Sequence, residues 1–208
     1  MTIDRAGWPF IGAAWLPAAA CLFTGLPLPA IGLAILGVAL GLFFRDPVRH
    51  PPTEPGIVVS PADGKVLSTG QADPTLAPEG AWEQISIFLS PLDVHVNRVP
   101  HEGRVTRVDH VPGKFLPAYR DRAEAENERN EVWVEYEDHT IVFRQVVGTL
   151  ARRVVCRVKV GDSVRTGERF GIMKFGSRMD VFLPAGTDLL VTAGDTVRGG
   201  ETIVARLI

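Results

Sequence analysis

The stretch Gly161-Asp162-Ser163-Val164-Arg165-Thr166-Gly167-Glu168 recurs 33 positions later as Gly194-Asp195-Thr196-Val197-Arg198-Gly199-Gly200-Glu201. In each copy the Gly-Asp pair is typical of a turn, the valine of a buried strand position and the second glycine of the next bend. A match of this length at a fixed offset indicates an internal duplication. The end of the chain is therefore predicted to fold as two related β halves.

The chain between residues 57 and 160 also has the pattern of a β domain. Short apolar or alternating runs are separated by Pro, Gly and Asp, which predicts a mainly β fold. The predicted strands are 57–59, 64–67, 85–89, 94–99, 103–108, 131–136, 140–147 and 152–160. Only Ala118–Arg129 has a helical composition, and because it is polar nearly throughout we expect a mobile loop or a surface turn of helix.

The N-terminal part is different, because Trp8–Phe44 contains no charged residue. The segment Leu26–Pro29 divides this part into Trp8–Thr24 and Ala30–Phe44, each shorter than the roughly 20 residues of a perpendicular membrane span. We expect an apolar α-helical hairpin in a membrane, either as two thin spans or as a re-entrant pair. The alternatives are a signal peptide, which has one apolar core and a basic start, and a buried soluble hairpin.

Charged residues beside this hairpin predict its orientation. Both ends of a hairpin lie on one side of the membrane, and Arg5, Arg45 and Arg49 predict that this side is the cytoplasm. Four prolines then follow within 46–56, which is typical of a stiff, extended connector. The expected organisation is a membrane-anchoring hairpin at 1–45, a connector at 46–56 and a β-rich domain at 57–208.

Composition argues against some classes of function. The net charge of −2 and the lack of a basic stripe argue against a nucleic-acid partner. Cys21 and Cys156 lie far apart and outside any Cys-x-x-Cys pair, so the sequence indicates neither a disulfide framework nor a metal site.

The dipeptide Gly176-Ser177 lies between the two copies of the repeat. A serine hydroxyl held in a tight turn can attack the preceding carbonyl, and glycine has no side chain to block that approach. Gly-Ser is also an ordinary turn sequence, so the dipeptide alone does not distinguish a self-cleaving bond from a loop.

Three segments carry a family resemblance: Ser60-Pro61-Ala62-Asp63-Gly64-Lys65-Val66, Ser90–Pro100 and Lys174–Asp180. With the apolar N-terminus, the Phe-Phe-Arg-Asp-Pro junction at 43–47 and the run 127–130, they make the chain similar to phosphatidylserine decarboxylase proenzymes of the short, membrane-anchored, pyruvoyl-dependent type. The repeat itself resembles the two halves of the biotinyl/lipoyl-carrier fold, a barrel-sandwich of hairpins. That likeness implies an exposed hairpin tip at Lys174–Ser177.

The resemblance implies roles for individual residues. Ser177 supplies a covalent pyruvoyl group, and cleavage between Gly176 and Ser177 makes a β chain of 1–176 and an α chain of 177–208 that remain associated. His95 corresponds to a functional histidine and Asp63 to an aspartate that orients it. The longer members of the family carry a second histidine where this chain has Arg98. That departure leaves the base open, with three further candidates: His101, His110 and His139.

The chemistry of these residue types is consistent with those roles. A serine hydroxyl needs a base such as His95, whose cation a carboxylate such as Asp63 can orient and stabilise. Attack of the Ser177 oxygen on the Gly176 carbonyl gives an ester, and loss of the Ser177 α-proton expels the β chain and leaves dehydroalanine. Hydrolysis then releases ammonia and leaves pyruvoyl. This ketone would form a Schiff base with a substrate amine and draw electrons from the breaking C–C bond.

The expected activity is decarboxylation of phosphatidylserine, or of a related serine phospholipid, to phosphatidylethanolamine with release of CO2. A phospholipid substrate stays in the bilayer, which agrees with the predicted anchor, and exposed strand edges are compatible with a homodimer. The alternative is a membrane-tethered biotinyl/lipoyl-type carrier or assembly module using Lys174. In that case the usual Glu-Ala before the carrier lysine is replaced by Gly171-Ile172.

Overall fold

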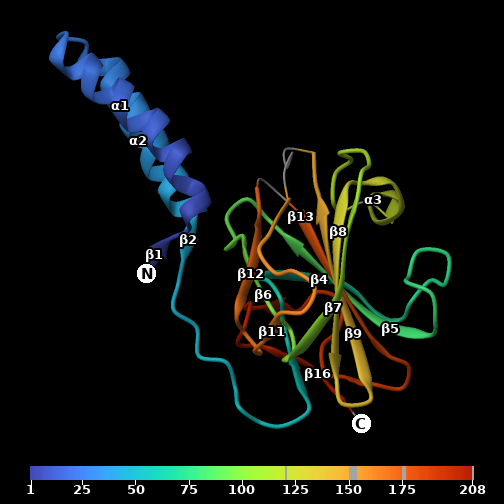
Figure 1. The fold of residues 1–208 in the computed structure, drawn as a ribbon. Coiled ribbons are helices and arrows are strands. Elements are labelled where there is room, and N and C mark those ends of the chain that lie inside the picture. Colours follow the sequence, from blue (N-terminus) through green and yellow to red (C-terminus); the bar gives the residue numbers. More distant parts are fainter. Residues whose placement is uncertain (120, 150–153, 175–176, 208) are drawn as a thin grey trace. The chain divides into compact units, whose positions relative to one another are not determined.

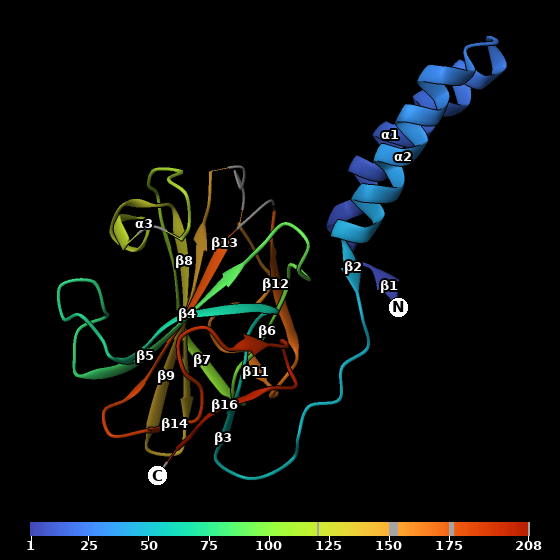
Figure 2. The same ribbon diagram turned by 180° about the vertical axis from the view of Figure 1, so that it is seen from behind.

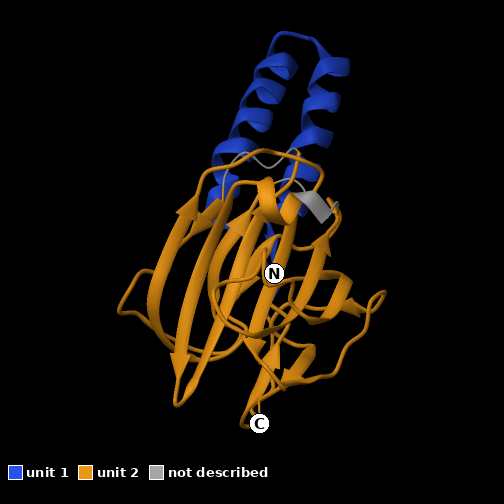
Figure 3. Cartoon of the chain, turned by 90° about the vertical axis from the view of Figure 1, so that its right-hand side faces the viewer, with its two compact units in different colours: residues 1–48 blue, residues 49–208 orange. Residues whose placement is uncertain are grey.

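The computed structural model describes residues 1–119, 121–149, 154–174 and 177–207. Contacts divide the chain into two compact units, Met1–Val48 and Arg49–Ile208 (Figure 3). Each unit is described by itself below.

The first unit is a helical hairpin, as the sequence predicts. A short 3-10 turn (Arg5–Gly7) leads into α1 (Trp8–Phe23), and α2 (Pro27–Phe43) returns beside it, while β1 (Thr2–Ile3) pairs with β2 (Arg45–Asp46). The helices pack through small residues, and a Cβ on Gly37 would lie 2.3 Å from the Trp15 Nε1 atom. Close approach of the two helices therefore depends on glycine at that position.

The outward faces of both helices are apolar. Large side chains on them are exposed, and the clearest are Leu16, Phe23, Leu28 and Ile35. The segment Arg5–Phe23 has 19 residues and a mean hydropathy of 1.4, so it is long and apolar enough to cross a membrane. Exposed apolar side chains of this kind are stable against lipid rather than water, and this helix could anchor the chain to a membrane.

The second unit is built on a strongly curled sheet of eight strands, each antiparallel to its neighbours (Figures 1 and 2). In sheet order the strands are β11 (Ser163–Val164), β7 (Gly103–Val111), β8 (Arg129–Tyr136), β9 (His139–Val147), β13 (Ser177–Pro184), β5 (Trp82–Leu89), β4 (Gly64–Gln71) and β15 (Thr196–Val197).

Two three-stranded sheets complete the second unit. One has the order β10 (Val154–Cys156), β12 (Arg169–Met173) and β6 (Val96–Arg98), and the other has the order β14 (Asp188–Leu189), β16 (Ile203–Arg206) and β3 (Ile57–Val59). Each strand predicted from the sequence overlaps an observed one, and residues 152–153 of the last prediction lie outside the described residues. The prediction of a mainly β fold is confirmed.

The core lies on one face of the large sheet. Side chains alternate along a strand, so Ile85, Ile87 and Leu89 of β5 point to the same face, where they are fully buried in one cluster. Met179 and Val181 of the neighbouring β13 join this cluster. The residues between them point to the other face, which is called the outer face below.

The two copies of the repeat lie at the two edges of the large sheet. Val164 of the first copy pairs with Gly103 of β7, and Val197 of the second pairs with Gly64 of β4. A Cβ on Gly64 would lie 2.1 Å from the Phe88 carbonyl oxygen, and one on Gly103 would lie 2.4 Å from that of Glu135. The duplication therefore forms two quasi-equivalent edges, and the likeness to a biotinyl/lipoyl barrel is only loose.

Two sequence expectations are wrong. Ser177 does not lie in an exposed hairpin tip, because it is fully buried at the start of β13, and β12 and β13 belong to different sheets; residues 175–176 of the expected tip lie outside the described residues. The segment around α3 (Asp121–Glu126) is not a solvated turn, because Ala123 and Glu124 are buried. Its polar composition hid this packing, since Glu124 is buried with ionic partners rather than with apolar ones.

Candidate active site

Ser177 is the first residue of β13, an interior strand of the large sheet. It pairs with Leu89 at the end of β5 and with Val147 at the end of β9. Its side chain is fully buried, and its Oγ atom has no hydrogen-bond partner among the described residues. A buried hydroxyl without a partner is costly in a folded protein, and such groups call for an explanation. Gly176 lies outside the described residues.

His95 is fully buried beside the strand that leads to Ser177. Its Nδ1 atom lies 3.0 Å from the carbonyl oxygen of Asp93. The backbone N–H of Met173 donates to the carbonyl oxygen of His95 over 3.2 Å, and Met173 ends β12 four residues before Ser177. This contact brings His95 to the end of β12 from which the chain runs to Ser177.

A side-chain hydrogen bond supports the same placement. Gln145 Nε2 donates to Asn97 Oδ1 over 2.8 Å, which joins β6 to the core face of β9. Asn97 of β6 therefore points toward the large sheet, and His95 directly precedes this strand. Gln145 lies two residues before Val147, which pairs with Ser177. Two separate contacts thus direct His95 to the end of the sheet where Ser177 lies.

Two of the other histidines lie at the opposite end of the large sheet. His139 begins β9 while Val147 ends it, so His139 is separated from the Ser177 pair by eight residues, or roughly 27 Å of strand. His101 packs edge-on against Tyr136 with ring centroids 4.6 Å apart, and Tyr136 pairs with His139. His110 is at the Ser177 end but is exposed on β7, 3.9 Å from Glu128.

Asp63 lies at the same end of the sheet as Ser177, but its contacts are with other residues. It directly precedes β4, whose Lys65 pairs with Phe88 next to Leu89. Its carboxylate accepts hydrogen bonds from Arg49 Nη2 (2.7 Å) and from the Gly199 backbone N–H (2.8 Å). Within the described part of the chain, its hydrogen bonds therefore go to the connector and to the second repeat copy.

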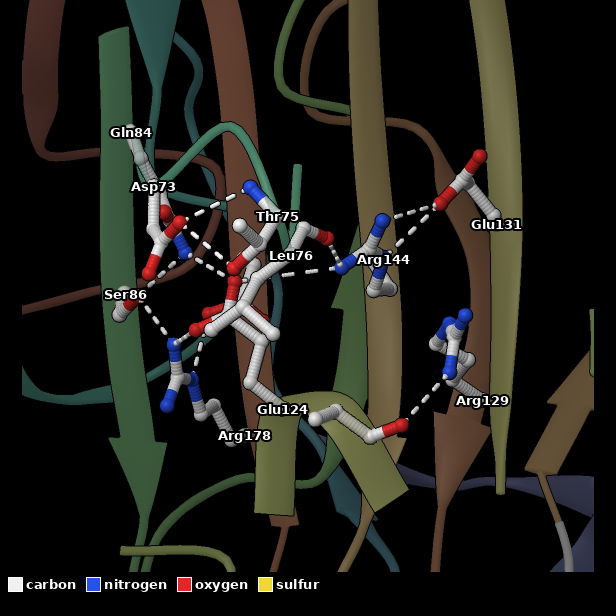
Figure 4. Close-up of polar contacts among 12 residues, drawn as sticks. Asp73, Thr75, Leu76, Gln84, Ser86, Glu124, Arg129, Glu131, Arg144 and Arg178 are labelled. Carbon is white, nitrogen blue, oxygen red and sulfur yellow. Dashed lines mark hydrogen bonds and ion pairs between the residues drawn. The ribbon is translucent and has the colours of Figure 1, made fainter. Parts of the chain in front are cut away.

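A buried ionic cluster lies on the outer face, directly behind the Ser177 end of β13 (Figure 4). Arg178 donates from Nε to Asp180 Oδ1 (2.6 Å) and from Nη2 to Ser86 Oγ (2.8 Å) and Glu124 Oε2 (2.5 Å). Arg144 of β9 joins the cluster through Glu124 at 3.9 Å and also binds Glu131 of β8 at 2.7 Å. Four strands and α3 are thus tied together by charged side chains that are almost fully buried.

Burial and neighbouring charges shift the pKa values in this cluster. Burial, and next the charge of Asp180, raise the pKa of Glu124 above its usual value, against the opposing effect of Arg178. Burial alone would lower the pKa of Arg178, but Asp180 and Glu124 outweigh it and raise that pKa. Arg178 therefore stays charged, and its two carboxylate partners compete for one guanidinium group.

The sequence interpretation missed Arg178, Asp180 and Glu124. A signal was present, because Arg178 and Asp180 alternate with Met179 and Val181, a pattern that places two charges on one face of a strand. Within the described residues, no group of three or more His, Cys, Asp or Glu side chains could hold a metal ion.

Comparisons with known proteins identify the family of this chain. The family profile of phosphatidylserine decarboxylase matches residues 38–205. A phosphatidylserine decarboxylase proenzyme of Anaplasma phagocytophilum (strain HZ) is 43% identical over 99% of this chain and 91% of its own length. One from Symbiobacterium thermophilum is 44% identical, covering 99% and 95%, and one from Salinibacter ruber is 45% identical, covering 94% and 86%. The chain belongs to the phosphatidylserine decarboxylase family.

Proposed function

We propose that this chain is a self-processing, pyruvoyl-dependent carboxy-lyase that converts phosphatidylserine to phosphatidylethanolamine and CO2. One observation carries the proposal: the Ser177 hydroxyl is buried without a described partner at the first residue of an interior strand. A hydroxyl in that state is not solvated, so a base can activate it without competition from bound water. Family membership and the word proenzyme in the names of the relatives support a maturation step.

His95 is the residue that we assign as base during cleavage. It is buried, its backbone contacts the end of β12, and it lies two residues from Asn97, which binds Gln145 of the large sheet. The same side chain is then placed to return a proton to the substrate carbon that loses CO2. The pyruvoyl group, once formed at residue 177, would supply a ketone that withdraws electrons from the bond being broken.

Asp63 has a less direct role in this proposal. It lies at the Ser177 end of the sheet but binds Arg49 and the Gly199 N–H. We assign it to positioning the turn before β4 in the uncut chain, through its bonds to Arg49 and Gly199. Positioning this turn and orienting His95 differ in their kinetic signature, because loss of orientation slows cleavage without lowering stability.

The proposed substrate is consistent with an anchored enzyme. The apolar helices of the first unit would hold the β domain at the bilayer, where phosphatidylserine resides. Arg5, Arg45 and Arg49 beside these helices favour the cytoplasmic side. Protease protection in sealed membrane vesicles of known orientation tests this placement.

Denaturing mass spectrometry of the purified full chain tests the proposed function. We expect fragments of 1–176 and 177–208, with the smaller one lighter than its sequence by the mass of one ammonia. The Ser177→Ala variant should stay intact. A wild-type chain that remains whole after prolonged incubation, or one that gains biotin or lipoate on Lys174, would contradict the proposal and favour the carrier function. Lys174 is half-buried and the comparisons offer no support for a carrier.

A further inference from the structure

A cavity of about 500 Å³ lies between the connector and the first copy of the repeat. Its walls carry four arginines against one carboxylate, with a threonine hydroxyl between them: Arg49, Arg98, Arg165, Arg169, Glu168 and Thr166. Such a lining is unusual in a chain with a net charge of −2. Arg49 is paired with Asp63 and Glu201, so the excess positive charge of this concave place comes from the other three arginines.

Two of the four arginines of this cavity are buried and held in position. The Arg49 side chain is 8% exposed and is fixed by Asp63 and by Glu201 at 3.0 Å. Arg98 is 6% exposed, and its Nη1 atom donates to the Gly167 carbonyl oxygen over 3.0 Å. Guanidinium groups fixed in this way lose little conformational entropy when a ligand binds.

Glycine makes room for this arrangement. A Cβ on Gly200 would lie 2.7 Å from the Arg98 Cδ atom, and the φ of 79° at Gly200 is one that other residues rarely adopt. On the other side, a Cβ on Gly167 would lie 2.2 Å from the Pro51 Cγ atom. The chain therefore passes close to the arginine stem and to the connector where only glycine fits.

Three cavity residues of the first repeat copy have no counterpart of the same type beside the second copy. The backbone N–H of Arg98 donates to the carbonyl oxygen of Pro61, and the backbone N–H of Val59 donates to that of Pro100. This reciprocal pair of hydrogen bonds makes Val59 the structural equivalent of Arg98. Counted by the 33-residue offset, Gly199 stands for Thr166 and Thr202 stands for Arg169. Three polar or cationic groups of the cavity are thus absent from the equivalent place in the second copy.

We propose that this cavity binds a phosphate group, either as free phosphate or as the phosphate of a lipid head group. Arginine forks match the oxygens of phosphate and form charge-assisted hydrogen bonds with them. Thr166 Oγ1 already accepts the Glu102 N–H (3.0 Å), which leaves its O–H to donate. One oxygen of Glu168 accepts the Arg165 N–H (3.0 Å), which reduces its repulsion of an anion.

The Arg169 side of the cavity is separated from the residue that contacts His95. Arg169 begins β12 and Met173 ends it, so the cavity lies about 13 Å along this strand from the residue that contacts His95. Phosphate binding would also give a role to Arg98, which occupies the position of a histidine in the longer family members. The proposal does not depend on self-cleavage.

Calorimetric titration of the full chain in detergent with inorganic phosphate tests the proposal, using the Ser177→Ala background so that maturation has no influence. Arg165→Gln and Arg98→Gln should each weaken phosphate binding at least tenfold, because each removes a charge-assisted hydrogen bond. The matched control is Arg198→Gln, the equivalent of Arg165 in the second copy, and it should stay within twofold. Arg165 is exposed, so its variant tests the proposal even if Arg98→Gln fails to fold.

The source of the phosphate is tested in lipid nanodiscs. If the phosphate of a lipid head group occupies the cavity, discs of phosphatidylglycerol and discs of phosphatidylcholine should both suppress the phosphate titration, because both lipids carry a phosphodiester. If free phosphate is the ligand, the titration should persist in both. The proposal is overturned if the affinity is unchanged in both cavity variants, or if chloride at equal ionic strength reproduces the heat of phosphate binding.

Discussion

The Nη2 atom of Arg178 lies 2.5 Å from the Glu124 Oε2 atom, and both side chains are more than nine-tenths buried. Arg178 follows directly on Ser177, whereas Glu124 belongs to α3, more than fifty residues earlier in the chain. Cleavage before Ser177 would convert this ion pair into a contact between two chains. The new end of the α chain would then be held from the outer face as well as by β5 and β9.

Removing the charge of Arg178 should destabilise the fold strongly. Arg178→Met leaves Glu124 and Asp180 buried without their shared cation, and breaking a buried pair in this way typically costs about 3–5 kcal/mol. Denaturant unfolding of the uncut Ser177→Ala chain measures the change. Glu126→Gln is the matched control, since the Lys114–Glu126 pair is mostly exposed and should contribute less than about 1 kcal/mol. Equal losses in both variants would contradict a special role for the buried cluster.

His95→Ala should slow self-cleavage by about two to four orders of magnitude, which is the usual contribution of a general base. The measurement is the fraction of intact chain against time by denaturing mass spectrometry. His139→Ala should mature at the normal rate, because His139 lies at the far end of β9. If His139→Ala stalls while His95→Ala matures, our assignment of the base is wrong.

Stability should fall in mild acid partly because of His101. Burial is the largest effect and lowers the pKa of His101 below its ordinary value of 6.5, despite the Glu102 carbonyl and the charge of Glu102, which favour the cation. The unfolded state therefore binds the proton more tightly, and stability present above pH 6.5 is lost as the pH falls toward the lowered pKa. His139 adds to the lowering and Glu137 opposes it.

His101→Gln should flatten this pH dependence. The melting temperature of the variant, measured between pH 7.5 and 5, should change less steeply than that of the parent chain. His110→Gln is the control, since the His110 side chain is 55% exposed. Identical slopes for the parent chain and His101→Gln would show that other groups cause the acid sensitivity.

Gly171→Ala should disturb both stability and the site. A Cβ at this position would lie 2.3 Å from the Val155 carbonyl oxygen and 2.8 Å from Gln145 Nε2, so the Gln145–Asn97 hydrogen bond must shift. Overpacking of this kind costs about 1–3 kcal/mol. We expect slower cleavage as well, because this hydrogen bond helps to direct His95. Unfolding midpoints and cleavage rates that both match those of the parent chain would contradict this.

The architecture of the β domain could largely be predicted from its sequence because its signals are local. Alternation in 131–136 and the turn residues around each run mark β4, β5, β7, β8 and β9 of the large sheet, whereas β13 was not predicted as a strand. The pairing of these strands could not be predicted, because β12 and β13 are neighbours in sequence but belong to different sheets. That assignment depends on contacts with β5, β6 and β9, which no local pattern encodes.

Some residues of the candidate site could likewise be predicted from local motifs, and others could not. Ser177 and His95 stand in recognisable motifs, and the structure directs them to one end of the sheet. Asp63 stands in a motif too, yet its observed partners are Arg49 and Gly199, the first from a proline-rich segment with no signal for such a contact. Glu124 was missed because an acidic residue in a polar segment is normally solvated.

Because β13 is an interior strand, the protein can fold more readily before cleavage than after it. Uncut, the chain closes the large sheet in a unimolecular reaction, with every strand supplied by one molecule. After a cut before Ser177, the two repeat copies reside on separate polypeptides, and reassembly becomes second order in protein concentration. The lifetime of the cleaved form would then depend on a low unfolding rate, because separated chains would rarely reassemble.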